Sequence, residues 1–340
     1  MSCIEDDPQE QVTERDYTRD GLSPGITEGT DGVKLLEPRH VPLGGPRAMN
    51  VRRTLPQRAR SLVGAWCFLD FYGPDDVTQT GGMRVPRHPH TGLATVSWLF
   101  SGSVDHIDSA GHRTTVRPGD AVFMNAGRGI THSEFSSSDT QILHGAQLWY
   151  AFPEHNRFSD PGLDVHRPEE ITGDGWAARV FAGSLLGVTS PLQTRAPISG
   201  AELRLEPGVD LDIEVPAGHE HALLRVQGYV SINCTDVPED NLAVIDTGRT
   251  VLRIRAGASP VLALLIGGEP FGEEIVMWWN FIGRSHEEIE QFRAVYQAEM
   301  GFDGPQALGQ DGLQFGEFPP GQPDPLPAPA LPTTRLKPRS

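Results

Sequence analysis

Short runs of alternating hydrophobic and polar residues, separated by turn residues, fill the middle of the chain. Residues 95–100 lead into a turn at 101–103, and residues 121–124 lead into a turn at 125–127. Strands that recur about every 8 to 12 residues, with glycine-containing turns between them, are typical of a β-sandwich or β-barrel. The pattern therefore predicts an all-β fold.

The second half of the chain repeats this pattern. Residues 224–230 have the same order of strand, glycine turn and strand as residues 99–104. Such internal repetition predicts two similar β-barrels in tandem, joined near residues 167–174. The strands predicted for the second barrel are 211–215, 222–227, 229–233, 250–255 and 261–266.

One helix is predicted after the second barrel, over residues 285–300. Ser285 and Glu288 have the spacing of a capping box, which satisfies free backbone N–H groups at a helix start. Four apolar residues then share one face, and Gly301 ends the pattern. We expect this face to pack across the barrels; the alternative is that it binds a partner. The four residues are Ile289, Phe292, Val295 and Tyr296.

Both ends of the chain differ in composition from the middle. The first segment is acidic and lacks apolar periodicity, and the last contains nine prolines. Neither composition favours a packed core, so both ends are predicted to be disordered, with partner docking as the alternative for the tail. The predicted parts are an acidic arm (1–33), an N-terminal barrel domain (34–167), a C-terminal barrel domain (168–284), the helix (285–300) and a proline-rich tail (301–340).

Charge and cysteine usage narrow the functional classes. The chain has 28 Lys and Arg against 45 Asp and Glu, a formal charge of −17. An acidic surface repels phosphate, so direct nucleic-acid binding is not expected. No apolar run approaches the roughly 18 residues of a membrane span, and the first 20 residues are too polar for a signal peptide. Three widely spaced cysteines fit a reducing compartment, so we expect a cytoplasmic protein. They are Cys3, Cys67 and Cys234.

Two pairs of potential metal ligands lie in the first barrel. His88 and His90 are two residues apart, and His132 and Glu134 repeat that spacing. Residues i and i+2 of a strand point to the same face, so each pair can reach one centre. If the two strands are neighbours, three nitrogens and one oxygen surround a divalent ion such as Fe(II), Mn, Ni, Cu or Zn. The alternative is a set of hydrogen-bonded structural histidines.

Several phrases around these ligands resemble the pirin family of the cupin superfamily. The resemblance covers roughly residues 35–298, and its most specific motifs lie in the first half. It implies two facing cupin (jelly-roll) barrels, with iron, usually Fe(II), held in the N-terminal one by the residues that match the family's ligands. The phrases are residues 68–74, 88–92, 104–109, 118–134 and 267–270, and the matching ligands are His88, His90, His132 and Glu134.

The sequence also departs from the family pattern. Ala94 stands where many cupins have a carboxylate. Phe71 stands before the Gly-Pro turn where relatives commonly have histidine or another residue, and residues 277–281 read MWWNF. These departures weaken the inference that this chain shares the family's substrate more than they weaken the prediction of the metal site. A second histidine pair, His219 and His221, has no histidine on the strands that follow, so we expect no metal in the second barrel.

The resemblance implies two principal functions. Some pirins open the flavonol quercetin with O₂, in which case Glu134 accepts the substrate's hydroxyl proton. Others are redox-dependent transcriptional cofactors, which here implies a non-enzymatic iron sensor that binds a regulatory protein partner. A sugar isomerase is the third reading, and a monomer is expected. His106 is the best further candidate to line the first barrel. Large apolar residues alternate on these strands, so some of them must face the interior and can hold a flat ring, while core packing explains most of them. They are Trp98, Phe100, Phe123, Met124 and Phe135.

Overall fold

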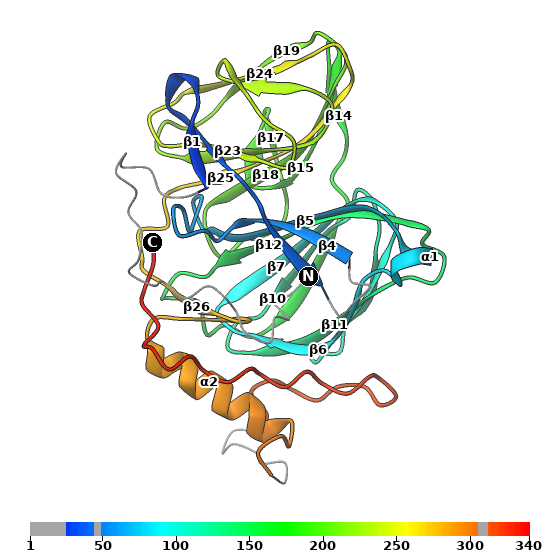
Figure 1. Ribbon diagram of the computed structural model, residues 1–340, viewed down its shortest axis with the longest axis vertical. Helices are drawn as coiled ribbons and strands as arrows, with labels where there is room; N and C mark the ends of the chain where they lie inside the picture. Colours follow the sequence, from blue (N-terminus) through cyan, green and yellow to red (C-terminus); the bar gives the residue numbers. More distant parts are fainter. Residues whose placement is uncertain (1–24, 44–48, 305–311) are drawn as a thin grey trace.

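Two β-structures stack on one another, and a single long helix lies beneath them (Figure 1). The computed structural model describes residues 25–43, 49–304 and 312–340. Each β-structure consists of a large sheet facing a four-stranded sheet, with antiparallel pairing between neighbouring strands. The prediction of an all-β protein built from two tandem cupin domains is therefore confirmed, although each barrel remains a pair of facing sheets.

The first barrel contains the strands that carry the candidate ligands. Its large sheet has the order β13 (Gly162–His166), β10 (Ala121–Asn125), β7 (Leu93–Ser101), β12 (Ile142–Ala151), β5 (Trp66–Asp76), β4 (Met49–Leu55) and β3 (Arg39–Leu43). Its small sheet has the order β6 (Arg84–His90), β11 (Ile130–Ser136), β8 (Val104–Asp108) and β9 (Arg113–Val116). A short helix, α1 (Val77–Thr80), links β5 to β6.

The second barrel has the same two-sheet plan. Its large sheet has the order β1 (Ile26–Glu28), β2 (Val33–Leu36), β23 (Leu242–Ile245), β20 (Glu220–Gln227), β25 (Val261–Gly268), β18 (Ile198–Leu205), β15 (Trp176–Ala182) and β14 (Ile171–Gly173). Its small sheet has the order β19 (Asp210–Glu214), β24 (Val251–Ala256), β21 (Val230–Ile232) and β22 (Thr235–Asp236). A hairpin of β16 (Ser184–Leu185) and β17 (Val188–Thr189) lies beside it.

Strand alternation separates the interior of the first barrel from the interface between the barrels. On β5, Leu69 and Phe71 belong to the apolar cluster that also contains residues of the second barrel's large sheet, whereas Phe68 belongs to a different cluster inside the first barrel. Successive residues of a strand point to opposite faces, so the two large sheets pack back to back. Polar bonds also cross this interface, because Trp66 Nε1 donates to the Gly267 carbonyl at 3.0 Å and Trp98 Nε1 donates to Glu202 Oε2 at 2.8 Å.

The domain boundaries differ from the predicted ones at both ends. Residues 26–36 form β1 and β2, and β2 pairs with β23, so this segment completes the second barrel and not the first. Part of the predicted arm is thus ordered; residues 1–24 lie outside the described part. At the other end, β26 (Val276–Trp278) and β27 (Phe281–Gly283) return to the first barrel, where Phe281 bridges to Thr91.

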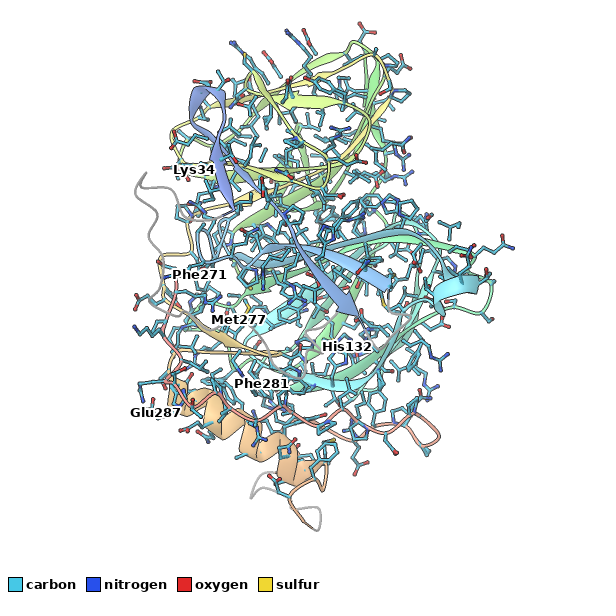
Figure 2. The ribbon with its side chains drawn as sticks, viewed as in Figure 1. Lys34, His132, Phe271, Met277, Phe281 and Glu287 are labelled. Carbon is cyan, nitrogen blue, oxygen red and sulfur yellow. The ribbon has the colours of Figure 1, made fainter. Side chains whose placement is uncertain are left out.

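The predicted helix is present as α2 (His286–Glu299). Ser285 caps it by accepting a hydrogen bond from the Glu288 N–H, as the capping box predicts. Its apolar face packs on the first barrel through the β26–β27 hairpin and not across both barrels: Ile289, Phe292 and Tyr296 share a cluster with Phe281. Figure 2 shows Phe281 and Met277 between the helix and the barrel interior. No helix in the described part of the chain is long and apolar enough to cross a membrane.

The end of the chain is ordered, contrary to the predicted disordered tail. Residues 312–340 run along α2 and below β6 in Figure 1. Phe315 is fully buried, the Leu326 N–H donates to the Arg87 carbonyl at 2.7 Å, and Tyr296 Oη donates to the Leu326 carbonyl at 2.6 Å. Proline lacks an N–H but keeps its carbonyl, so an extended proline-rich segment can still be held by donors from its neighbours.

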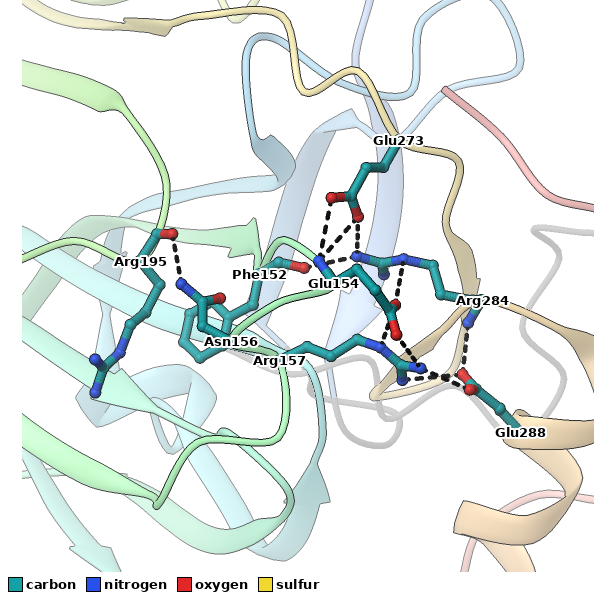
Figure 3. Close-up of polar contacts among 8 residues, drawn as sticks. All are labelled: Phe152, Glu154, Asn156, Arg157, Arg195, Glu273, Arg284 and Glu288. Carbon is teal, nitrogen blue, oxygen red and sulfur yellow. Dashed lines mark hydrogen bonds and ion pairs between the residues drawn. The ribbon is translucent and has the colours of Figure 1, made fainter.

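A network of ion pairs holds the start of α2 to both neighbouring loops (Figure 3). Arg157 binds Glu154 at 2.6 Å and Glu288 at 2.7 Å, and Arg284 binds Glu273 at 2.6 Å. Arg284 also donates to the Phe152 carbonyl at the end of β12. The network therefore fixes the helix, the loop after β12 and the loop after β25 relative to one another.

Candidate metal centre

The four predicted ligands lie on two neighbouring strands of the small sheet. His88 and His90 are on β6, His132 and Glu134 are on β11, and His132 pairs directly with His88. All four side chains are almost completely buried, with at most 2% exposed. The register shifts between His132 and Glu134, where β6 carries one extra residue, so Glu134 pairs with Val85. Figure 2 shows His132 within the lower barrel.

The three imidazoles converge. His90 Nε2 and His132 Nε2 are 3.1 Å apart, and the ring centres of His88 and His132 are 4.3 Å apart. One ring nitrogen from each of the three histidines lies within 4.8 Å of the other two. Ligand nitrogens that each bind a metal at about 2.0–2.1 Å need this kind of spacing. A carboxylate oxygen of Glu134 belongs to a second, overlapping group, with nitrogens of His106 and His132.

Burial keeps these imidazoles neutral. It lowers the pKa of His88 to about 4 and lowers the pKa values of His90 and His132 well below the usual range. Proximity to the other histidines lowers the pKa of His132 further. A neutral imidazole has a lone pair to give to a metal, whereas a protonated one has none. The three rings are therefore ready ligands at neutral pH.

Hydrogen bonds from outside the cluster fix which nitrogen of His88 and of His132 faces it. His88 Nδ1 lies 2.7 Å from the Pro86 carbonyl, so it carries the proton and leaves Nε2 as the ligand atom. His132 Nδ1 lies 3.3 Å from His106 Nδ1, and His106 Nε2 lies 3.2 Å from Asp108 Oδ2. The Asp108 carboxylate accepts a hydrogen bond from the protonated Nε2 of His106. His106 Nδ1 is then unprotonated and accepts a hydrogen bond from His132 Nδ1. His132 Nε2 then faces the other rings.

His106 thus lies beside the cluster, as predicted, but Asp108 was not foreseen. Asp108 is fully buried and accepts bonds from His106, from His112 and from the backbone of Ala110. Its distance of two residues from His106 on β8 was the available signal, because both side chains then share a face. A buried carboxylate at that position orients the neighbouring imidazole.

Comparisons with known proteins agree with this arrangement. Residues 48–150 match the family model of pirin, and residues 200–302 match that of the pirin C-terminal cupin domain. The chain belongs to the pirin family.

Individual relatives are similar over most of the chain. A Pseudomonas aeruginosa protein with a provisional quercetin 2,3-dioxygenase name is 35% identical over 267 residues, which cover 78% of this chain and 84% of that one. The crystal structure of quercetin 2,3-dioxygenase from Acinetobacter baumannii is 31% identical, with a TM-score of 0.80, covering 89% of this chain and 97% of that one. An Escherichia coli pirin in complex with nickel(II) is 20% identical, with a TM-score of 0.56, covering 70% of this chain and 99% of that one, and shares the fold.

The aromatic lining of this pirin's first barrel differs from the expected one. Trp98 and Phe123 lie in the interface between the barrels, and Phe135 lies beside Arg84. Phe100 packs on Phe71 and His144, also away from the ligands. Among the five predicted residues, Met124 belongs to the interior cluster.

Two other aromatic residues lie beside the histidines. The Trp149 ring is 5.0 Å from the His90 ring, and Phe68 stacks on Trp149 with ring centres 3.9 Å apart. Both residues alternate with interface residues on β12 and β5. Predicting that they lie beside the histidines requires knowing which face of each strand points into the barrel, and the sequence does not give this.

The second histidine pair of the pirin chain is placed differently. His221 is fully buried on β20, where it pairs with Ile245 of β23 and with Gly267 of β25. His219 is its nearest imidazole, with ring centres 6.1 Å apart. The groups of potential metal ligands found among the described residues both lie in the first barrel.

Proposed function

We propose that this pirin is a metal-dependent dioxygenase that opens a flavonol such as quercetin with O₂. In this proposal His88, His90, His132 and Glu134 hold the metal, and Fe(II) is the expected ion, with Mn, Ni, Cu and Zn as alternatives. The observation that carries the proposal is the set of three neutral, buried imidazoles converging beside a carboxylate. This nitrogen and oxygen set suits borderline divalent ions, and nickel(II) is found with the related Escherichia coli pirin.

The side chains have separate roles in this reaction. A bound divalent metal supplies a Lewis acid that lowers the pKa of a coordinated hydroxyl and, if redox-active, couples the substrate to O₂. Glu134 accepts the flavonol's 3-hydroxyl proton on a carboxylate oxygen. Asp108 and His106 keep His132 in the required tautomer, while Phe68 and Trp149 form an apolar wall that excludes water beside His90.

The support for the substrate comes from the relatives. The Pseudomonas and Acinetobacter proteins bear names of quercetin 2,3-dioxygenases, and both cover more than three quarters of this chain. The balanced reaction consumes one O₂ per flavonol and releases one CO as the ring opens. It therefore gives three quantities that can be measured together: O₂ uptake, loss of flavonol absorbance and CO.

The test begins with metal-free protein reconstituted separately with each candidate ion. We expect Fe(II) protein to consume O₂ with quercetin and to release CO in a one-to-one ratio. The Glu134→Gln variant should lose at least 100-fold in kcat, because the amide cannot accept the proton. Stoichiometric metal binding without O₂ uptake for any ion would refute the dioxygenase.

That same outcome would favour the second candidate, a non-enzymatic metal-dependent sensor. The observation behind it is the net charge of −17, which suits a basic protein partner. Its distinguishing property is partner recovery that differs between oxidising and reducing conditions. Equal recovery in both conditions would rule it out.

A further inference from the structure

The inner face of β12 carries two buried hydrogen-bond donors that the proposed reaction does not yet use. Ala146, Leu148 and Tyr150 of this strand belong to the cluster between the barrels, so the alternate residues point into the first barrel. Trp149 does so, since it joins the interior cluster with Phe68. Gln147 lies two residues before Trp149 and shares its face.

The neighbours of Gln147 along this strand face lie near two of the predicted ligands. Beyond one side of it, Trp149 touches the ring of His90. Beyond the other side, Gly145 pairs with Tyr72, whose pKa is raised first by burial and then by the nearby charge of Glu134. A side chain between these two positions on the same strand face therefore points into the interior that His90 and Glu134 also face.

Gln147 is held in one orientation. Its Oε1 accepts a hydrogen bond of 2.9 Å from Ser97 Oγ on the neighbouring strand β7, and the two residues are paired in the sheet. The amide NH₂ therefore points away from Ser97. Gln147 is 1% exposed, so water outside the protein does not reach it.

The donors on this face have no acceptor in the described part of the chain. Neither Gln147 Nε2 nor Trp149 Nε1 has a hydrogen-bond partner among the described residues, and both atoms are buried. Burying a donor without an acceptor is costly, so such groups in a site mark positions where a ligand supplies the acceptor. Two neutral donors from residues on one strand face favour a molecule with acceptor oxygens over a cation.

We propose that Gln147 Nε2 and Trp149 Nε1 are positioning donors that bind the acceptor oxygens of the substrate at the metal. This inference rests on the proposed function, and it defines the substrate class more narrowly: a planar molecule with adjacent keto and enolate oxygens, as in a deprotonated 3-hydroxy-4-oxo flavonol. The donors stabilise the charge that appears on these oxygens once Glu134 has taken the proton. Ser97 acts through Gln147 by fixing its amide.

The test measures binding without turnover. Full-length Fe(II)-loaded protein is titrated with quercetin under anaerobic conditions, and the absorbance shift gives Kd. Gln147→Leu keeps the shape and removes the donor, so we expect a Kd about 10- to 100-fold higher. The infrared carbonyl band of bound quercetin should move to higher frequency, because it loses a hydrogen bond. Ser97→Ala should give a smaller change in the same direction.

A matched control separates this role from structural damage. Gln297 is the buried glutamine of α2, whose Oε1 accepts from the Ala328 N–H outside the barrel interior, and Gln297→Leu should leave Kd and the carbonyl band unchanged. Iron affinity should be the same in all variants. An unchanged Kd and band in Gln147→Leu would overturn the proposal while leaving the dioxygenase intact.

Other outcomes distinguish the two proposals. Binding that weakens in Gln147→Leu, in a protein that never consumes O₂, would support the positioning role and refute the dioxygenase. Wild-type protein that binds iron but not quercetin would overturn both.

Discussion

The two barrels share one plan but have different interiors. In the first barrel, His88 faces His132 across a pair of strands in the small sheet. In the second, His221 lies on the large sheet between Ile245 and Gly267, and the cluster around it contains apolar residues such as Leu223 and Val33. Both barrels bury a histidine, yet only the first surrounds it with other potential ligands in the described part of the chain.

This difference shows what a histidine pair two residues apart requires to become a site. The spacing puts both rings on one face, but a metal also needs ligands from the neighbouring strand. In the first barrel, β11 supplies two potential ligands, and Asp108 on β8 orients one of them through His106. In the second barrel, the neighbouring strands offer an isoleucine and a glycine. The following predictions test this comparison.

The largest effect is expected from removing a ligand in the first barrel. His132→Ala should weaken Fe(II) or Ni(II) binding by more than about 1000-fold, since it removes one of three converging nitrogens. The measurement is competition with a chelator of known affinity. The matched variant His221→Ala should leave the affinity unchanged. Equal losses from the two variants would mean that the second barrel also takes part in binding.

The second effect concerns acid stability. Burial, and then His219, lowers the pKa of His221 to about 4, so the unfolded chain takes up this proton first as pH falls. The neutral, buried His221 contributes its full share to the free energy of unfolding above about pH 6.5. That contribution, up to about 3 kcal/mol, is lost as the pH falls from 6.5 to 4. His221→Leu should flatten the fall in the free energy of unfolding across that window, measured by urea titration. The exposed His155→Gln should keep the wild-type slope.

A third, smaller effect is expected from the residue that orients His132. Asp108→Asn presents an NH₂ group to His106 Nε2. His106 then adopts its other tautomer, in which a protonated Nδ1 faces His132. Metal affinity should fall about 10- to 100-fold, with the fold retained. His112 also contacts Asp108 but its side chain is 39% exposed, so His112→Ala should change the affinity less than about 3-fold. A larger loss in His112→Ala than in Asp108→Asn would contradict the proposed orientation.

The smallest effect compares ion pairs made by a buried arginine with an ion pair that is exposed on both sides. Arg157→Met removes the bonds to Glu154 and Glu288 in the network of Figure 3, and we expect a loss of about 1–3 kcal/mol of stability. Arg335→Met removes an exposed pair with Glu287 at the same helix and should leave Tm unchanged. Thermal unfolding monitored by circular dichroism measures both. Equal shifts would mean that the network does not anchor α2.

The sequence predicted those features that depend on local spacing. The period of two in a strand placed His88 and His90 on one face, and the capping box located the start of α2. It did not predict which face of β7 and β10 meets the other barrel, and so it did not show that Trp98 and Phe123 lie in that interface. It also missed the pairing of β2 with β23, because that contact joins segments far apart in the chain. Long-range pairing depends on the whole fold and not on local pattern.

The position of residues 312–340 has a consequence for folding during synthesis on the ribosome. They cover the outer side of β6 and β11, where Arg87 Nη2 donates to the Gly316 carbonyl and Thr131 Oγ1 donates to the Phe315 carbonyl. These residues are translated after β6 and β11, so a nascent chain completes both strands while their outer faces are still uncovered. Likewise β2 is synthesised early, but it can pair only after its partner strand β23 has been translated. Translation that stops before Phe315 leaves that surface uncovered.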